Sequence, residues 1–174
     1  VRCLPSPKGN LPTHDTDREN GRRLLWCITL PELARIEVGI LGEALKGRTD
    51  DYDIVIRNHP HQHISDQELL ELSAQHNLNV QLDDRKDILD EIGGFHAVLV
   101  SAHSTVVIDM LSINMPVVGF LGKAFGVSWL DFDVETPEQL QRVLDELSMQ
   151  SKPSLMTSFP CEEWDRFIQG VDVA

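Results

Sequence analysis

The chain has 174 residues, of which 41% are hydrophobic and 25% charged, proportions typical of one globular domain. The formal net charge is −13, and the acidic excess lies entirely in residues 59–174, where acidic side chains outnumber basic ones by 19 to 6. This charge excludes non-specific binding of nucleic acid and disfavours general electrostatic binding to anionic membranes. No apolar stretch approaches the roughly 18 residues of a transmembrane helix.

Residues 1–21 contain several prolines and glycines without the period of a strand or helix, which predicts an irregular lead-in or linker before a folded domain over 22–174. The chain begins without Met and without the layout of a signal peptide, so we expect an excised fragment. Cys3, Cys27 and Cys161 are too few and too scattered for a disulfide framework or a zinc cluster. They favour a reducing compartment, with the protein in the cytoplasm or peripheral to the inner membrane face.

Residues 24–29 form a short, continuous apolar run, which predicts a strand buried on both faces. A helix is predicted from Pro31 to a stop at Gly47, with Pro31 in the first helical position. Apolar residues recur along it at helical spacing: Leu33, Ile36, Ile40, Leu41 and Leu45.

Residues 52–57 predict the second strand, and Ser65 predicts the N-cap of a helix with Glu68 at the capping-box position. The apolar residues expected to point inward from this helix are Leu69, Leu70 and Leu72. Residues 80–82 predict a third strand, followed by a helix over residues 86–92 that ends at two glycines.

The second half repeats the same unit, with strands predicted over residues 97–101, 117–120 and 127–132. Helices are predicted over residues 104–113, from residue 136 onward and over residues 164–171. This alternation predicts a three-layer α/β/α fold, a doubly wound, Rossmann-like parallel sheet of about six strands. With the order 3-2-1-4-5 and the sixth strand outermost, a ligand would bind beyond the carboxyl ends of strands 1 and 4.

Polar residues follow three of these strands. His103, Ser104 and Thr105 open the fourth helix, where hydroxyls, free N–H groups and the helix dipole could bind phosphate; alternatively, Ser104 only caps the helix. His59 follows the second strand and could donate to a phosphate oxygen, or could simply be a turn residue before a proline. Thr29 follows the first strand and is a further phosphate-binding candidate.

Four motifs occur in order between residues 22 and 120: IVIRNHP at 54–60, DIL at 87–89, AVLVSAHSTVVID at 97–109 and MPVV at 115–118. Together they resemble the C-terminal, donor-binding domain of GT-B fold glycosyltransferases, in the branch with an HP motif and a later Ser/Thr motif. That branch includes bacterial sialyltransferases, capsular polysaccharide transferases and the glycerophosphotransferases of teichoic-acid synthesis.

The resemblance implies that His59, together with Ser104 and Thr105, binds the donor phosphate. It places Asp109 near the ribose hydroxyls and Asp84 in a loop that holds a base or sugar edge. It also implies a nucleotide-sugar donor, a glycan acceptor and an N-terminal acceptor domain outside this chain, with no metal or other cofactor. The expected activity is glycosyl transfer in surface polysaccharide synthesis; the catalytic base would belong to the other domain, so the fragment alone would be inactive.

Several alternatives remain open. A nucleotide-sugar epimerase has a similar layout, and the domain could instead be a non-catalytic nucleotide-binding or interaction module. His59, His61 and His63 would share one face of an extended segment, as metal ligands can. The G-x-G-x-x-G fingerprint of dinucleotide binding is absent, and the segment around Ser104 lacks the glycines of a nucleophile elbow.

Overall fold

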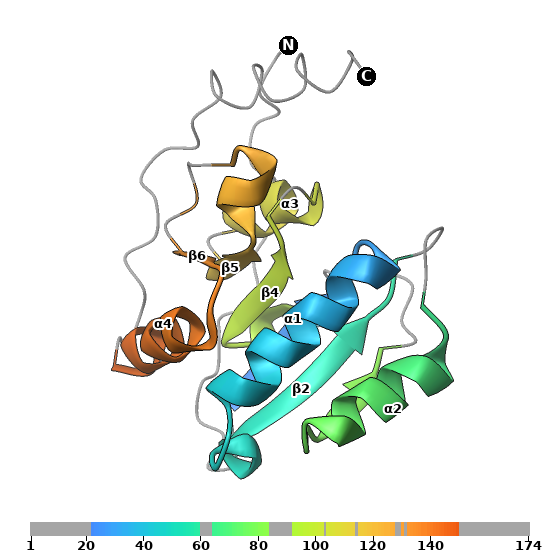
Figure 1. The fold of residues 1–174 in the computed structure, drawn as a ribbon. Helices are drawn as coiled ribbons and strands as arrows, with labels where there is room; N and C mark the ends of the chain where they lie inside the picture. The colour runs from blue at the N-terminus through green and yellow to red at the C-terminus, as the bar shows by residue number, and fades with distance from the viewer. Residues whose placement is uncertain are drawn as a thin grey trace.

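Figure 1 shows the fold as a computed structural model, which describes residues 22–59, 64–83, 92–102, 104–113, 115–127, 130 and 132–149. The strands are β1 (Arg22–Cys27), β2 (Tyr52–Arg57), β3 (Val80–Leu82), β4 (Ala97–Ser101), β5 (Val117–Phe120) and β6 (Phe132–Val134). The α-helices are α1 (Pro31–Ala44), α2 (Asp66–Gln75), α3 (Val106–Ser112) and α4 (Pro137–Met149). The 3-10 helices are η1 (Thr49–Asp51), η3 (Ile92–Gly94) and η4 (Gly122–Phe125).

The strands form one parallel sheet in the order β3-β2-β1-β4-β5-β6. This confirms the predicted fold class and strand order. The central strand β1 pairs with β2 from Arg22↔Tyr52 to Cys27↔Arg57, and with β4 from Leu24 to Cys27. The strand order therefore reverses between β1 and β4, the position at which doubly wound sheets bind ligands.

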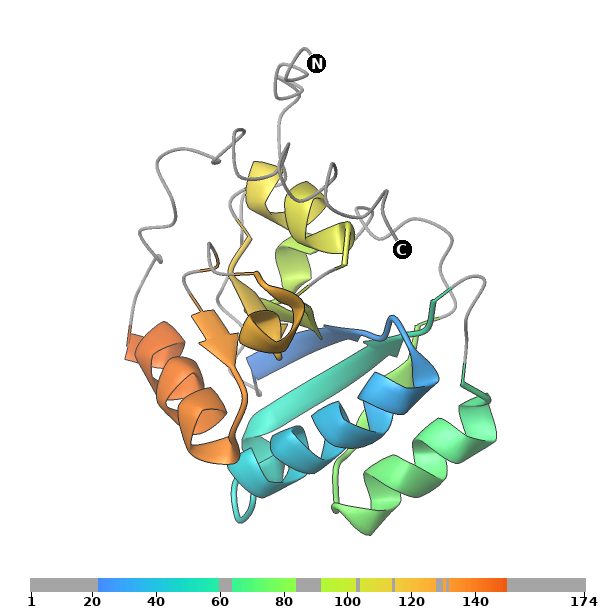
Figure 2. The same ribbon diagram turned by 45° about the horizontal axis from the view of Figure 1, so that its top comes forward.

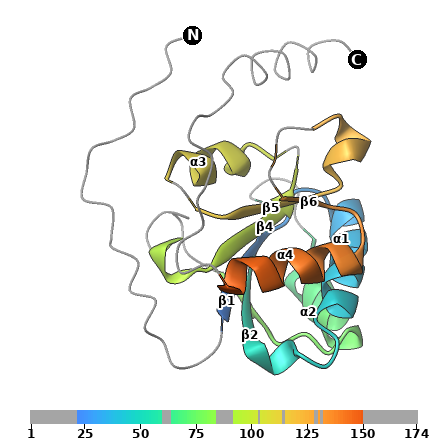
Figure 3. The ribbon, with the colours of Figure 1, turned by 90° about the vertical axis from the view of Figure 1, so that its left-hand side faces the viewer.

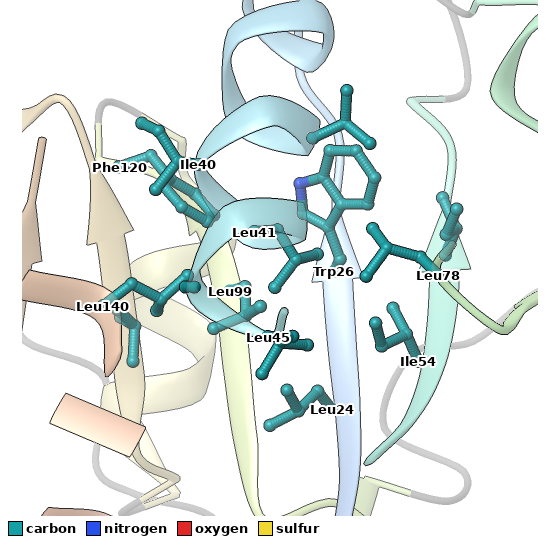
Figure 4. Close-up of a cluster of buried hydrophobic side chains, with 14 of the residues drawn as sticks. Leu24, Trp26, Ile40, Leu41, Leu45, Ile54, Leu78, Leu99, Phe120 and Leu140 are labelled. Atoms are coloured by element: carbon teal, nitrogen blue, oxygen red, sulfur yellow. The ribbon is translucent and has the colours of Figure 1, made fainter. Parts of the chain in front are cut away.

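Helices cover both faces of the sheet, giving three layers (Figures 2 and 3). On one face, α1, α2 and α4 pack over a large apolar core, where Trp26 and Leu99 of the sheet meet Leu41 and Leu45 of α1 (Figure 4). On the other face, α3 and the η3 turn cover a second core that includes Leu25 of β1. The inner strands β1, β4 and β5 are mainly apolar because both of their faces are covered, as the sequence predicted for the first strand.

Two of the elements whose limits differ from the prediction are α3 and β6. The helix predicted from residue 104 begins at Val106, because Ser104 lies in a turn where its N–H donates to the Ser101 carbonyl at 2.9 Å. The sixth strand, predicted over 127–132, is β6 at Phe132–Val134. It begins late because the chain first forms η4, whose Gly122 N–H donates to the Asp133 carboxylate at 2.6 Å.

Some side chains also point the other way. Ile36 and Leu70, both expected in the core, are 50% and 45% exposed. On α1, Glu37 is buried instead of Ile36. It is 0% exposed and shares a helix face with the buried residues Ala34 and Leu41. The buried face of α1 is therefore rotated about the helix axis from the face predicted by its large apolar residues.

The N-cap prediction for α2 is confirmed, since Ser65 Oγ accepts a hydrogen bond from the Glu68 N–H at 3.2 Å. The carboxylate of Glu68 pairs with Arg35 and so joins α2 to α1. The helices predicted over 86–92 and 164–171 and the lead-in over 1–21 fall wholly or largely outside the described residues. Within the described ranges, no helix is both long enough and apolar enough to cross a bilayer.

Candidate functional site

The loops after β1 and β4 meet at the carboxyl edge of the sheet, where the strand order reverses. Thr29 follows β1 and Ser101 ends β4, and the Thr29 hydroxyl donates to Ser101 Oγ at 2.6 Å. The Ile28 N–H donates to the Arg57 carbonyl at 2.9 Å, which ties the end of β2 to the same place. Thr29 therefore lies at the switch point, the place where the strand order reverses, which is the position predicted for it from the sequence.

Ser104 caps the turn that leads into α3. Its Oγ accepts from the Val106 N–H at 3.3 Å, and its carbonyl accepts from the Val107 N–H at 3.2 Å. The Ile108 N–H donates to the Thr105 carbonyl at 3.0 Å. These bonds occupy the first N–H groups of a seven-residue helix, which the sequence analysis expected to be free.

The two hydroxyls of this turn differ in accessibility. The Ser104 side chain is 8% exposed, although its hydroxyl hydrogen can still donate while its oxygen accepts from the helix. Thr105 is exposed and makes no side-chain capping hydrogen bond. Thr105 is therefore the more accessible of the two predicted phosphate ligands.

His59 lies two residues beyond β2, at the start of a loop held by Asn58. The Asn58 side chain accepts from the His59 N–H at 3.1 Å and donates to the Ile64 carbonyl at 2.6 Å. It therefore bridges the two ends of the segment over residues 60–63. The partly buried His59 is in this way fixed on the strand next to Thr29.

The remaining predicted site residues are only partly covered by the structure. Asp109 is exposed on α3, and partial desolvation raises the pKa of its carboxyl. Asp84, His103, His61 and His63 lie outside the described residues. Within the described part, no group of three or more His, Cys, Asp or Glu side chains is arranged to hold a metal ion.

A buried carboxyl group that the sequence did not predict as a site residue lies near the carboxyl edge of the sheet. Glu37 of α1 accepts a hydrogen bond from Trp26 Nε1 at Oε2, at 2.9 Å, and another from Ser101 Oγ at Oε1. Burial raises the pKa of Glu37, and the two hydrogen bonds partly oppose that rise. A glutamate spaced at helical intervals from buried Ala34 and Leu41 was the signal in the sequence.

A second missed feature is an ion pair at the same edge. Arg57 Nη1 lies 3.0 Å from Asp83 Oδ2, with the two side chains 22% and 2% exposed. Arg57 also pairs in register with Cys27, the last residue of β1. In the sequence, this pair corresponds to an arginine at the end of an apolar strand and an aspartate directly after β3. The ion pair places a cation one strand away from the switch point.

A small pocket lies at the opposite, amino edge of the sheet, where its lining includes Arg22, Tyr52 and His96. Its volume of about 20 Å³ accommodates roughly one water molecule. It is too small to hold a nucleotide.

Comparison with protein families and with curated proteins finds no match to this chain. The functional inference therefore rests on the residues at the carboxyl edge.

Proposed function

We propose that this domain binds a nucleotide-sugar donor between the carboxyl ends of β1, β2 and β4, as the donor half of a metal-independent glycosyltransferase. The observation that carries the proposal is the hydrogen-bonded connection from Thr29 through Ser101 to Ser104 at the reversal of strand order. His59 lies on the neighbouring strand end. This is where a doubly wound sheet offers a ligand the greatest number of loop residues.

The start of α1 supports the proposal as well. The helix has 14 residues, begins at Pro31, two residues after Thr29, and has no side-chain cap. Its first internal hydrogen bond runs from the Ala34 N–H to the Leu30 carbonyl at 3.0 Å, so the N–H groups of Glu32 and Leu33 precede the ladder. Such a helix start provides donors and a positive dipole end for a phosphate.

Glycosyl transfer from a nucleotide requires stabilisation of the negative charge that develops on the leaving phosphate. Preorganised donors at the crevice can supply it without a metal: the imidazole of His59, the hydroxyls of Ser104 and Thr105, and the first turn of α1. The glycan acceptor and the catalytic base would come from an N-terminal acceptor domain. We place the reaction in the cytoplasm, in surface polysaccharide synthesis.

Calorimetric titration of the chain with CMP, CDP, UDP and GDP tests the proposal. We expect one nucleotide to bind, and His59→Ala and Thr105→Ala each to weaken binding by about 1 to 3 kcal/mol, because each removes a hydrogen bond to a charged group. Thr105 is a sharper choice than Ser104, whose replacement also removes the cap of Val106. Gln67→Ala, exposed on α2, is the control and should bind like the unmodified protein.

Two outcomes would count against the proposal. If no nucleotide binds, the domain is better explained as an interaction module. If a nucleotide binds equally well to both variants, the site lies elsewhere. Conversion of a UDP-sugar into its epimer by the chain alone would favour the epimerase alternative over glycosyl transfer.

A further inference from the structure

A continuous series of hydrogen bonds connects the interior of the protein with the carboxyl edge of the sheet, where the ligand crevice is proposed. Trp26 Nε1 donates to Glu37, Ser101 Oγ donates to the other oxygen of Glu37, and Thr29 donates to Ser101 at 2.6 Å. Glu37 and Ser101 are both 0% exposed, whereas Thr29 is 9% exposed and lies at the switch point. Thr29 is therefore the outer end of this series of hydrogen bonds.

The tryptophan determines where a proton can sit on the carboxyl group. An indole N–H only donates, so Glu37 Oε2 must accept from Trp26 at 2.9 Å. The other oxygen, Oε1, faces Ser101 Oγ. When Glu37 is protonated, its proton therefore lies on Oε1, between the carboxyl group and the serine.

The protonation state then sets the direction of every hydrogen bond in the chain, because each hydroxyl carries a single hydrogen. With Glu37 ionised, Ser101 donates inward and Thr29 donates to Ser101, so Thr29 offers only lone pairs to the crevice. With Glu37 protonated, the carboxyl donates to Ser101 and Ser101 donates to Thr29. The Thr29 hydrogen is then available to an anion.

We propose that Glu37 is a positioning residue which decides, through Ser101, whether Thr29 donates to or accepts from a ligand in the crevice. The ionised oxygens of a nucleotide phosphate only accept hydrogen bonds, so their binding favours the protonated form and draws one proton from solvent onto Glu37. No covalent bond to the ligand forms or breaks. This inference rests on the proposed function, because it assigns a regulation to the same site.

The surroundings of Glu37 allow this exchange. Burial is the main influence on its pKa and raises it, while Ser101 from β4 and Trp26 from β1 lower it as hydrogen-bond donors. Neither donor is charged. Cys27 on β1 is the titratable neighbour that senses the charge of Glu37. Among the described residues, no charged group from α2 or α4 contributes to the pKa of Glu37, and Arg35 of α1 pairs with Glu68 at the surface.

The test is calorimetric titration with CMP, CDP, UDP, GDP and inorganic phosphate between pH 5 and 9, in buffers of different ionisation enthalpy. The measured quantity is the number of protons taken up on binding by the unmodified chain minus the number taken up by Glu37→Gln. The glutamine carbonyl can accept from Trp26 while its amide donates to Ser101, so this variant holds Thr29 in the donating arrangement at every pH. Protons taken up by the ligand or by groups outside this series of hydrogen bonds contribute equally to both proteins.

At low pH we expect this difference to be near zero. At pH values above the pKa of Glu37 in the free protein, it should approach one proton per ligand bound. There the affinity of the unmodified chain should fall by about tenfold per pH unit relative to Glu37→Gln. Thr29→Val and Ser101→Ala, which interrupt the chain at its other two members, should also abolish the extra proton. Circular dichroism shows whether Glu37→Gln folds. If it does not, Thr29→Val and Ser101→Ala keep the test valid.

The outcomes separate the two proposals. Binding of a nucleotide with no extra proton at any pH overturns the role of Glu37 and leaves the proposed function standing. The same holds if Thr29→Val takes up as many protons as the unmodified chain. If neither a nucleotide nor phosphate binds, both proposals fail.

Discussion

Glu37 lies wholly inside the protein, although a carboxylate is costly to remove from water. The ordinary pKa of a glutamate is 4.5, and burial raises that of Glu37, so the folded chain retains a proton that the unfolded chain releases. Stability from this group is complete below the unfolded pKa and is lost as the pH rises through the folded pKa. Above that value its contribution is constant.

Glu37→Gln should therefore gain stability relative to the unmodified chain as the pH rises, and the gain should level off above the folded pKa. Urea unfolding at several pH values between 4 and 9 measures this gain in the free energy of unfolding. Glu43→Gln, exposed on the same helix, is the matched control and should give a profile parallel to that of the unmodified chain. A parallel profile for Glu37→Gln as well would contradict the prediction.

Cys27 should be unreactive in the folded protein. It is 4% exposed, and burial raises the pKa of its thiol to about 12, while the nearby Arg57 only partly lowers it. In a background with Cys3→Ser and Cys161→Ser, iodoacetamide at pH 8 should react about a thousandfold more slowly than with a free thiol, because the thiolate is scarce. Reaction should become fast in urea. Fast labelling of the folded chain, followed by mass spectrometry, would show that Cys27 is accessible.

At the scale of elements, α1 and α2 approach each other closely at Gly42. A Cβ added there would lie 2.4 Å from the Cβ of His76, so Gly42→Ala requires the two helices to separate. We expect a loss of about 1 to 3 kcal/mol in the free energy of unfolding, the usual cost of overpacking. Urea unfolding monitored by circular dichroism measures this loss.

Gly39 of the same helix is the control for Gly42. An added Cβ there meets nothing within 4 Å, so Gly39→Ala should stabilise the protein by about 0.5 to 1 kcal/mol through helix propensity. Equal effects of the two substitutions would mean that contact with His76 does not limit the packing of α1. A double variant with His76→Gly, which removes the clashing Cβ, should recover part of the loss at Gly42.

The regular elements were predictable where apolar patterning alone determines them. The strands at Tyr52–Arg57, Val80–Leu82, Ala97–Ser101 and Val117–Phe120 have their predicted limits, because each is a short run of mainly apolar residues. β1 lies two residues earlier than predicted. The predicted limits of the sixth strand were wrong because Asp133, within β6, accepts hydrogen bonds from the backbone N–H groups of Gly122 and Lys123 in η4. Such hydrogen bonds leave no periodic pattern in the sequence.

The same distinction applies to the site. The sequence placed Thr29 at the switch point because topology alone determines which strand ends meet there. It could not identify Glu37, since its partners Trp26 and Ser101 are 11 and 64 residues away and a glutamate on a helix ordinarily faces solvent. At the first turn of α3, the Ser104 hydroxyl accepts from the Val106 N–H, in line with the capping alternative that the sequence left open, and phosphate binding by Ser104 stays a prediction.

At the scale of the whole molecule, the net charge of −13 repels an anionic ligand at long range. Raising the salt concentration from 20 to 200 mM should screen this repulsion and increase the association rate constant for a nucleotide by a factor on the order of 2 to 5. Stopped-flow mixing measures the rate. A nucleoside without phosphate is the control and should show no such increase. A rate that falls with salt would instead indicate a local positive field strong enough to attract the ligand.

The strand order also determines when the crevice can form as the protein folds. β1, α1 and β2 are consecutive in the chain and can associate by closing short loops. The pairing of β1 with β4 instead joins residues such as Arg23 and His96, which are 73 positions apart. Closing a longer loop costs more entropy and slows folding. Because the proposed ligand site needs the end of β4 beside that of β1, the capacity to bind a ligand depends on this long-range pairing and not on the local association of β1 with β2.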